Sequence, residues 1–107
     1  MTNAKTEFLE HIRDKPPILC ARVIFGDPWY IDEESKFINL KMSYTQSDLE
    51  NFLCSIDKEY DLGYGDQELF GTIWYTNGTW SSRGDYDDGG EWWEHNTVPK
   101  IPDGLLT

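Results

Sequence analysis

Acidic and aromatic side chains gather in the last third of this 107-residue sequence. Between Glu59 and Glu94 there are nine Asp and Glu residues but a single base, Arg83, and four tryptophans lie within the same stretch. Carboxylates at such density can act as an acid–base pair, bind a cation or attract a basic partner. Their spacing decides among these three chemistries.

Catalysis by a carboxylate pair has little support. Asp85 and Glu94 could in principle act on a sugar next to tryptophan platforms. A pair on an exposed sheet face has no desolvated cleft that would separate two carboxyl pKa values, and no nucleophile beside a base is recognisable. We therefore expect no catalytic residues and a protein that is not an enzyme.

The acidic turn resembles a calcium loop only in part. With Asp85 as position 1, Asp87 falls at position 3 and Gly90 at position 6, but Gly89 occupies position 5 and Asn96 position 12, where the bidentate Glu belongs. Turn chemistry explains these residues better than cation binding. We expect neither a metal nor a cofactor.

The cysteines and histidines do not form a zinc site. Cys20 and Cys54 lie among apolar neighbours, and His11 and His95 share no ligand spacing with them. We predict two buried thiols and no disulfide. The charged N-terminus has no apolar segment of a signal peptide and no run is long enough to span a bilayer, so we expect a cytoplasmic protein.

The charge is unevenly distributed. The formal net charge is −11; residues 1–41 hold seven acids and six bases, whereas residues 42–107 hold thirteen acids and three bases. Binding to nucleic acid or an anionic membrane depends on Lys and Arg, so this balance opposes both. It favours a basic protein as partner.

Two amphipathic helices are predicted. The first is capped by Thr2 or Asn3 and ends at the prolines at positions 16 and 17. The second begins at a capping box of Ser47 and Glu50. Their apolar stripes comprise Ala4, Phe8, Leu9 and Ile12 in the first helix and Leu49, Phe52, Leu53 and Ile56 in the second.

Strand patterns surround these helices. Residues 18–26 read as a central strand and residues 36–42 as an alternating one, with a loop between them. Residues 69–75 then lead into Asn77-Gly78, the strongest short signal for a two-residue type I′ turn, and the chain returns through residues 79–87. A second turn at Asp88-Gly89 leads into residues 91–97.

The turns set the expected register. A turn centred on Asn77-Gly78 pairs Tyr75 with Trp80, and a turn at Asp88-Gly89 pairs Arg83 with Glu94. One sheet face then lies under the helices and carries Leu69, Gly71, Ile73, Tyr75, Trp80, Gly84, Tyr86 and Trp93. The other face carries Phe70, Thr72, Trp74, Ser81, Arg83, Asp85, Trp92 and Glu94.

The second face is the predicted binding surface, because tryptophans supply contact area and carboxylates meet Arg or Lys of a partner. Its expected partner-binding residues, with the turn acids, are Trp74, Asp85, Asp87, Asp88, Trp92 and Glu94. In the alternative interpretation, the loop at Trp29-Tyr30 or the C-terminal tail covers these tryptophans.

The predicted architecture is a single α+β domain over residues 1–107. Two helices pack on one face of a mostly antiparallel sheet of four to five strands in the order α-β-β-α-β-β-β, and residues 98–107 form an extended tail. No internal repeat is visible.

The block LFGTIWY, NGTW, RGDYD and EWWE within residues 61–102 resembles small acidic proteins encoded by tailed phages and prophages. The resemblance implies the cytoplasm of an infected bacterium, where such proteins often block host nucleases or other DNA-handling proteins, some by mimicking DNA. It transfers no binding residues to this chain.

The expected function is therefore non-enzymatic inhibition or modulation of a basic, nucleic-acid-handling host protein. Two alternatives stay open. One is an immunity protein that neutralises a toxin nuclease. The other is a small-ligand module in which Trp74 and Trp92 stack a sugar or a nucleotide.

Overall fold

The structure is a computed structural model, and it describes residues 2–26, 37–60, 68–85, 90–98 and 103–105. Its elements in chain order are β1 (Thr2–Asn3), α1 (Ala4–Ile12), β2 (Ile18–Phe25), β3 (Ile38–Leu40), α2 (Gln46–Ser55), β4 (Glu59–Tyr60), β5 (Leu69–Tyr75), β6 (Trp80–Asp85), β7 (Glu91–Asn96) and a 3-10 turn (Asp103–Leu105). The predicted α+β class and main element order are confirmed, with β1 and β4 as short additions.

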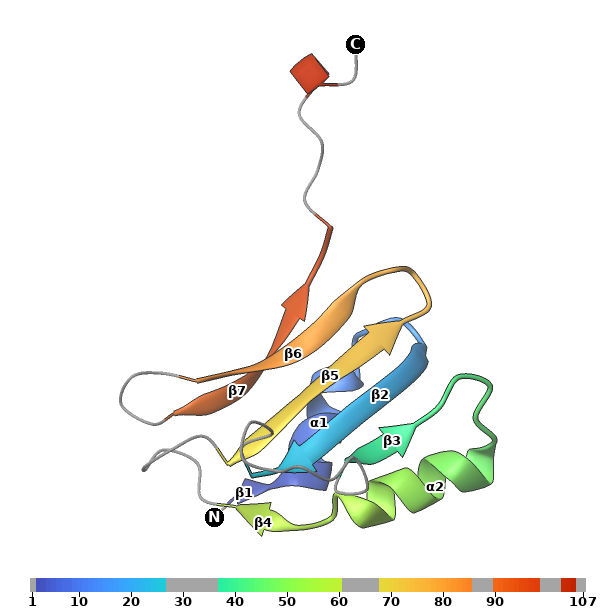
Figure 1. Cartoon of the computed structure of the whole chain (residues 1–107), viewed down its shortest axis with the longest axis vertical. Helices are drawn as coiled ribbons and strands as arrows, with labels where there is room; N and C mark the ends of the chain where they lie inside the picture. Colours follow the sequence, from blue (N-terminus) through green and yellow to red (C-terminus); the bar gives the residue numbers. More distant parts are fainter. Residues whose placement is uncertain (1, 27–36, 61–67, 86–89, 99–102, 106–107) are drawn as a thin grey trace.

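Five strands form one antiparallel sheet in the order β3-β2-β5-β6-β7, and β1 pairs with β4 in a separate two-stranded sheet (Figure 1). Helix α1 passes behind β2 and β5 in this view. The Phe8 ring of α1 meets Phe52 of α2 at 5.4 Å and Trp93 of β7 at 5.9 Å, both edge to face. Both helices therefore contribute to one core.

The core is continuous across the two sheets. Its buried residues are Ala4, Phe8, Ile18, Ala21, Val23, Leu40, Phe52, Ile56, Tyr60, Leu69, Ile73, Tyr75 and Trp93. Leu9, expected on the apolar stripe of α1, is instead 39% exposed. The covered face of the sheet is thus set by alternate residues of β2 and β5, as period-two patterning requires.

The helix caps differ in one case from the expectation. Asn3 caps α1 by accepting a hydrogen bond from the Thr6 amide, as predicted. Helix α2, however, starts at a capping box of Thr45 and Asp48, not Ser47 and Glu50. Asp48 accepts from the Thr45 amide at 2.9 Å, so an aspartate serves the role usually taken by Glu or Gln.

The first hairpin has a register one residue from the predicted one. Trp80 pairs with Trp74, not Tyr75. The loop has three residues, 76–78: the Gly78 amide donates to the Tyr75 carbonyl, and Gly78 alone in the loop has positive φ, at +87°. A type I′ turn needs positive φ at Asn77 too, so the prediction was wrong.

The second hairpin is also shifted by one residue, since Arg83 pairs with Trp93 and not with Glu94. The two one-residue shifts are in opposite directions along the sheet, so the residues of β7 keep the predicted alignment with β5. Only β6 has its two faces exchanged relative to the prediction. Ser81 and Arg83 therefore lie on the covered face, while Trp80 and Gly84 lie on the open one.

Candidate functional site

The face of the sheet opposite the helices is the candidate site, and we call it the open face. Strand register places its residues in cross-strand rows. The central row is polar and runs Asn39, Arg22, Thr72, Ser82 and Glu94 from β3 to β7. A parallel row contains Cys20, Trp74, Trp80 and Asn96, and Phe70 and Ile24 pair on the other side of the polar row.

The predicted binding residues are only partly brought together. Trp74 is 42% exposed on β5, and Glu94 is exposed on β7. Asp85 ends β6 opposite Glu91, at the same strand parity as Ser81 and Arg83, so the inverted register of β6 does not group it with Trp74 and Glu94 on the open face as predicted. Asp87 and Asp88 lie outside the described residues.

Trp92 is half-buried and lies across Gly84. A Cβ atom added to Gly84 would stand 2.8 Å from the Trp92 ring, so the missing side chain is what lets the indole lie flat there. Trp74 and Trp92 are two strands and four residues apart, about 16 Å at ordinary sheet spacings. One planar ligand therefore cannot stack on both indoles.

Two hollows flank Trp74 on the open face. A hollow of about 250 Å³ is lined by Arg22, Ile24, Phe37, Phe70, Gly71, Thr72 and Trp74. A second, of about 510 Å³, is lined by Cys20, Ala21, Arg22, Asn39, Leu40, Lys41, Met42 and Trp74. Arg22 and Trp74 border both, and among the residues that the structure describes neither lining contains an acid.

Positive and negative side chains lie at opposite ends of the open face. Arg22 and Lys41 lie at the β2–β3 end, and Glu94 lies at the β7 end of the row that contains Arg22. Arg22 and Glu94 are three strand spacings apart, about 14 Å. Among the described residues, the hollows beside Trp74 are therefore bordered by cations, and Glu94 lies at the far end of the sheet.

Arg83 lies on the covered face and forms the polar centre of the core. Its Nη1 donates to Glu7 Oε1 at 3.0 Å, and its Nη2 donates to the Tyr60 hydroxyl at 2.9 Å and to Glu91 Oε1 at 3.1 Å. Its side chain is 1% exposed and that of Glu91 fully buried. The expected exposed pair of Arg83 with Glu94 is wrong.

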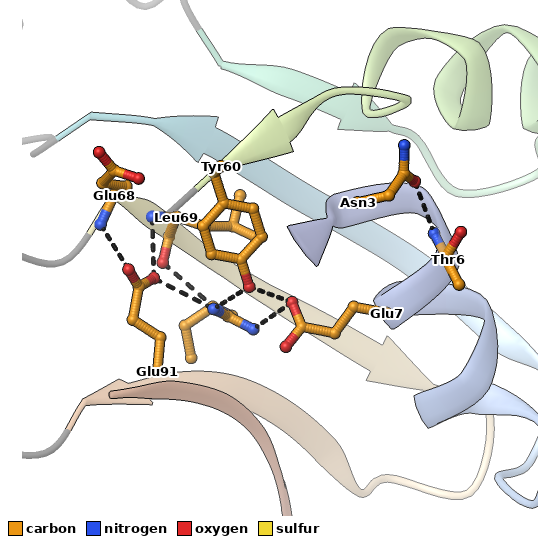
Figure 2. A network of polar contacts seen from close by, with 8 residues as sticks. Asn3, Thr6, Glu7, Tyr60, Glu68, Leu69 and Glu91 are labelled. Atoms are coloured by element: carbon orange, nitrogen blue, oxygen red, sulfur yellow. Dashed lines mark hydrogen bonds and ion pairs between the residues drawn. The ribbon is translucent and has the colours of Figure 1, made fainter. Parts of the chain in front are cut away.

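Glu91 also fixes the start of β5. Its Oε2 accepts from the Glu68 amide at 2.9 Å and its Oε1 from the Leu69 amide at 3.1 Å (Figure 2). On the other side of the cluster, the Tyr60 hydroxyl donates to Glu7. Burial, reinforced by the hydrogen bond to Glu7, raises the pKa of Tyr60, which therefore stays a neutral donor.

A second polar cluster lies under α1. Ser81 is fully buried, and its hydroxyl is 2.7 Å from both His11 Nε2 and the Tyr75 hydroxyl. Burial, with the nearby Lys15 charge, lowers the pKa of His11 to about 4, and burial raises that of Tyr75. Sequence spacing could not reveal this serine–histidine contact, because the two residues are 70 positions apart.

The buried position of Ser81 decides what the cluster can do. A nucleophile must reach a substrate carbon, and this hydroxyl has no exposed surface. The contact therefore satisfies buried polar groups, in keeping with the rule for interiors.

Neither metal ligands nor paired cysteines occur in the described part of the chain. No group of three or more His, Cys, Asp or Glu side chains there is arranged to hold an ion. Cys20 and Cys54 are free thiols; Cys20 is half-buried, but Cys54 is exposed on α2, which corrects the prediction of two buried thiols. No helix in these ranges is long and apolar enough to cross a membrane.

Comparison of the chain with protein-family models, curated proteins and solved structures gives no match. The geometry of the open face and the distribution of charge are therefore the features that indicate a function.

Proposed function

We propose that this protein is a non-enzymatic, acidic interaction module that binds and inhibits or modulates a basic, nucleic-acid-handling protein of a bacterial host. The interaction surface extends from Trp74 on β5 across the open face to β7 and includes the acidic segment 85–88 that follows from the end of β6. Its residues are Trp74, Asp85, Asp87, Asp88, Trp92 and Glu94.

The burial of Arg83 is the observation that carries this proposal. Arg83 is the only base among residues 59–94, and its charge is directed inward at Glu91 and Glu7. The nine acids and one base of that segment leave it a formal charge of −8. A negative field of this kind accelerates encounter with a cationic partner and disfavours nucleic acid itself.

Aromatic exposure supports the same surface. Trp74 is one of the few large apolar side chains with substantial exposure in the described residues, and Trp80 and Trp92 are half-buried on the same face. Tryptophans partly withdrawn from solvent are typical anchors of protein interfaces. Carboxylates beside such anchors suit a partner surface that normally holds phosphates.

An immunity protein directed at a toxin nuclease is the second candidate, since it needs the same acidic surface. The identity of the basic partner separates the two: a host DNA-handling protein supports the first reading and a secreted or contact-dependent toxin the second. The ligand module with Trp74 and Trp92 stacked on one ring is disfavoured by their separation across the sheet.

The proposal is tested by affinity capture followed by a purified binding assay. The tagged protein is incubated with bacterial lysate at about 50 mM salt, where screening is weak, and eluted at about 500 mM. A basic nucleic-acid-binding protein should be enriched, and its purified form should bind less tightly as salt rises. Enrichment of no basic protein at low salt would contradict the proposal.

A further inference from the structure

The cationic end of the open face is unexpected in a protein of net charge −11, and the charge that draws a basic partner to β7 does not explain it. We propose that the two hollows beside Trp74 form a binding site for a nucleoside monophosphate. The base stacks on Trp74, and the phosphate binds Arg22 and Lys41. This site shares Trp74 with the proposed partner surface, but its two cations lie at the opposite end of the open face from Glu94.

Arg22 is held in place but leaves donors available. Its Nε donates to Asn39 Oδ1 at 2.8 Å, and its guanidinium carbon lies 4.7 Å from the centroid of the Phe37 ring. Within the described residues, its two terminal nitrogens make no hydrogen bond or ion pair. A fixed guanidinium with two unengaged nitrogens is a typical receptor for phosphate oxygens.

Lys41 adds a second cation to the same concavity. It follows β3 two residues after Asn39, on the same side of the strand, and lines the larger hollow with Arg22 and Trp74. It has no ion-pair partner among the residues that the structure describes. Two cations suit a phosphate monoester, whose charge at neutral pH lies between −1 and −2, better than a single carboxylate.

Trp74 supplies the platform for a base. It is 42% exposed and borders both hollows. Thr72 pairs with Arg22 across β2 and β5, so Trp74 and Arg22 are diagonal neighbours, about 7 to 8 Å apart. This separation matches that between the base and the 5′-phosphate of one nucleotide.

The remaining lining residues fit a nucleotide as well. Ile24 is 1% exposed at the floor of the smaller hollow, where Phe37 and Phe70 add apolar walls. Thr72 and Asn39 offer a hydroxyl and an amide near the cations. A small, mostly apolar concavity with a few polar groups on one side is the usual form of a small-molecule site.

The proposal is tested by calorimetric titration of the full chain with AMP, GMP, CMP and UMP at low salt. A purine monophosphate should bind at least about tenfold more tightly than adenosine, which lacks the anion, or inorganic phosphate, which lacks the base. Amide shifts in NMR spectra should move at Cys20, Arg22, Thr72 and Trp74. They should stay unchanged at His95, near the β7 edge.

Variants separate the two halves of the site. Arg22→Gln should weaken AMP binding about tenfold and leave the weak binding of adenosine unchanged, whereas Trp74→Ala should weaken both and Trp74→Phe should retain most of the affinity. Arg13→Gln is the matched control, because Arg13 is an exposed arginine at the end of α1, on the other side of the sheet.

Three results would overturn the proposal. The first is no heat and no amide shift with any of the four nucleotides at about 5 mM, a concentration that detects even millimolar affinity. The second is inorganic phosphate or benzoate binding as tightly as AMP. The third is AMP binding that Arg22→Gln leaves unaltered.

Discussion

Arg83 Nη2 lies 3.1 Å from Glu91 Oε1, on the strand next to it, and both side chains are withdrawn from solvent. The pair joins β6 to β7, and through Glu7 and the Glu68 and Leu69 amides it also reaches α1 and the start of β5. The guanidinium also lies 5.3 Å from the Trp93 ring. Arg83 therefore stabilises the fold, and its buried guanidinium is not available to contact a partner.

Replacing Arg83 with methionine should therefore destabilise the protein by about 3 to 5 kcal/mol, because Glu91 would remain buried without its cation. Chemical denaturation monitored by tryptophan fluorescence measures the change. A cost below about 1 kcal/mol would show that the pair is exposed in solution.

A double variant and a control variant test whether the unpaired charge of Glu91 causes this loss of stability. Arg83→Met combined with Glu91→Gln should cost less than the sum of the two single changes, since the unpaired buried charge is gone. Arg13→Met, an exposed arginine on α1, should change the free energy of unfolding by no more than about 0.5 kcal/mol.

The His11 cluster predicts a pH dependence of stability. The pKa of His11 is about 4 in the folded protein, below the 6.5 of an unperturbed histidine. The unfolded chain therefore binds the proton more tightly between these values, so the His11 contribution is complete above pH 6.5 and is lost as pH falls toward 4.

Unfolding free energies measured from pH 7 to pH 4 check this prediction. His11→Gln should remove part of the slope, up to one proton, whereas His95→Gln, at an exposed histidine whose Nε2 is 3.0 Å from the Thr79 hydroxyl, should retain it. Equal slopes for the two variants would contradict the role of His11.

The loop of the first hairpin gives a further prediction. Gly78 has φ of +87° and open space around its Cα, so Gly78→Ala meets no clash but adopts a disfavoured backbone. The expected cost is about 1 to 2 kcal/mol. Gly78→Asn should cost less than Gly78→Ala, because Asn tolerates the left-handed region; equal unfolding energies would argue against this loop.

The sequence predicted the elements well because periodicity and caps are local signals. The four-residue spacing from Phe8 to Ile12 marked α1, and the apolar stripe through Phe52 and Ile56 marked α2. β7 was placed with the right face inward only because two one-residue errors in register cancelled.

The covered face of β6 could not be predicted from hydrophobicity. The expectation turned Trp80 inward and Arg83 outward, as apolar content suggests. The reverse holds because Arg83 and Ser81 find partners that are distant in sequence, among them Glu7 at 76 positions and His11 at 70. Long-range hydrogen bonds therefore decide which face of β6 is buried, against the pattern of apolar and polar residues. No local sequence motif predicts these bonds.

Substitutions at an exposed and at a buried tryptophan test which face of the sheet is open. Trp74→Ala should change the free energy of unfolding by about 1 kcal/mol or less, since the side chain is 42% exposed, and should weaken partner binding. Trp93→Ala should cost about 3 to 5 kcal/mol, because Trp93 is 7% exposed and packs on Phe8. Similar costs for both variants, measured by thermal unfolding, would contradict the assigned open face.

The most direct test of the acidic interaction surface is the association rate of the purified partner measured across a range of salt concentrations. Replacing Asp85, Asp87 and Asp88 with lysine should slow association about tenfold or more at low salt and flatten its salt dependence, with the melting temperature little changed. If the triple variant associates as fast as the unmodified protein at every salt concentration, the acidic surface does not bind the partner.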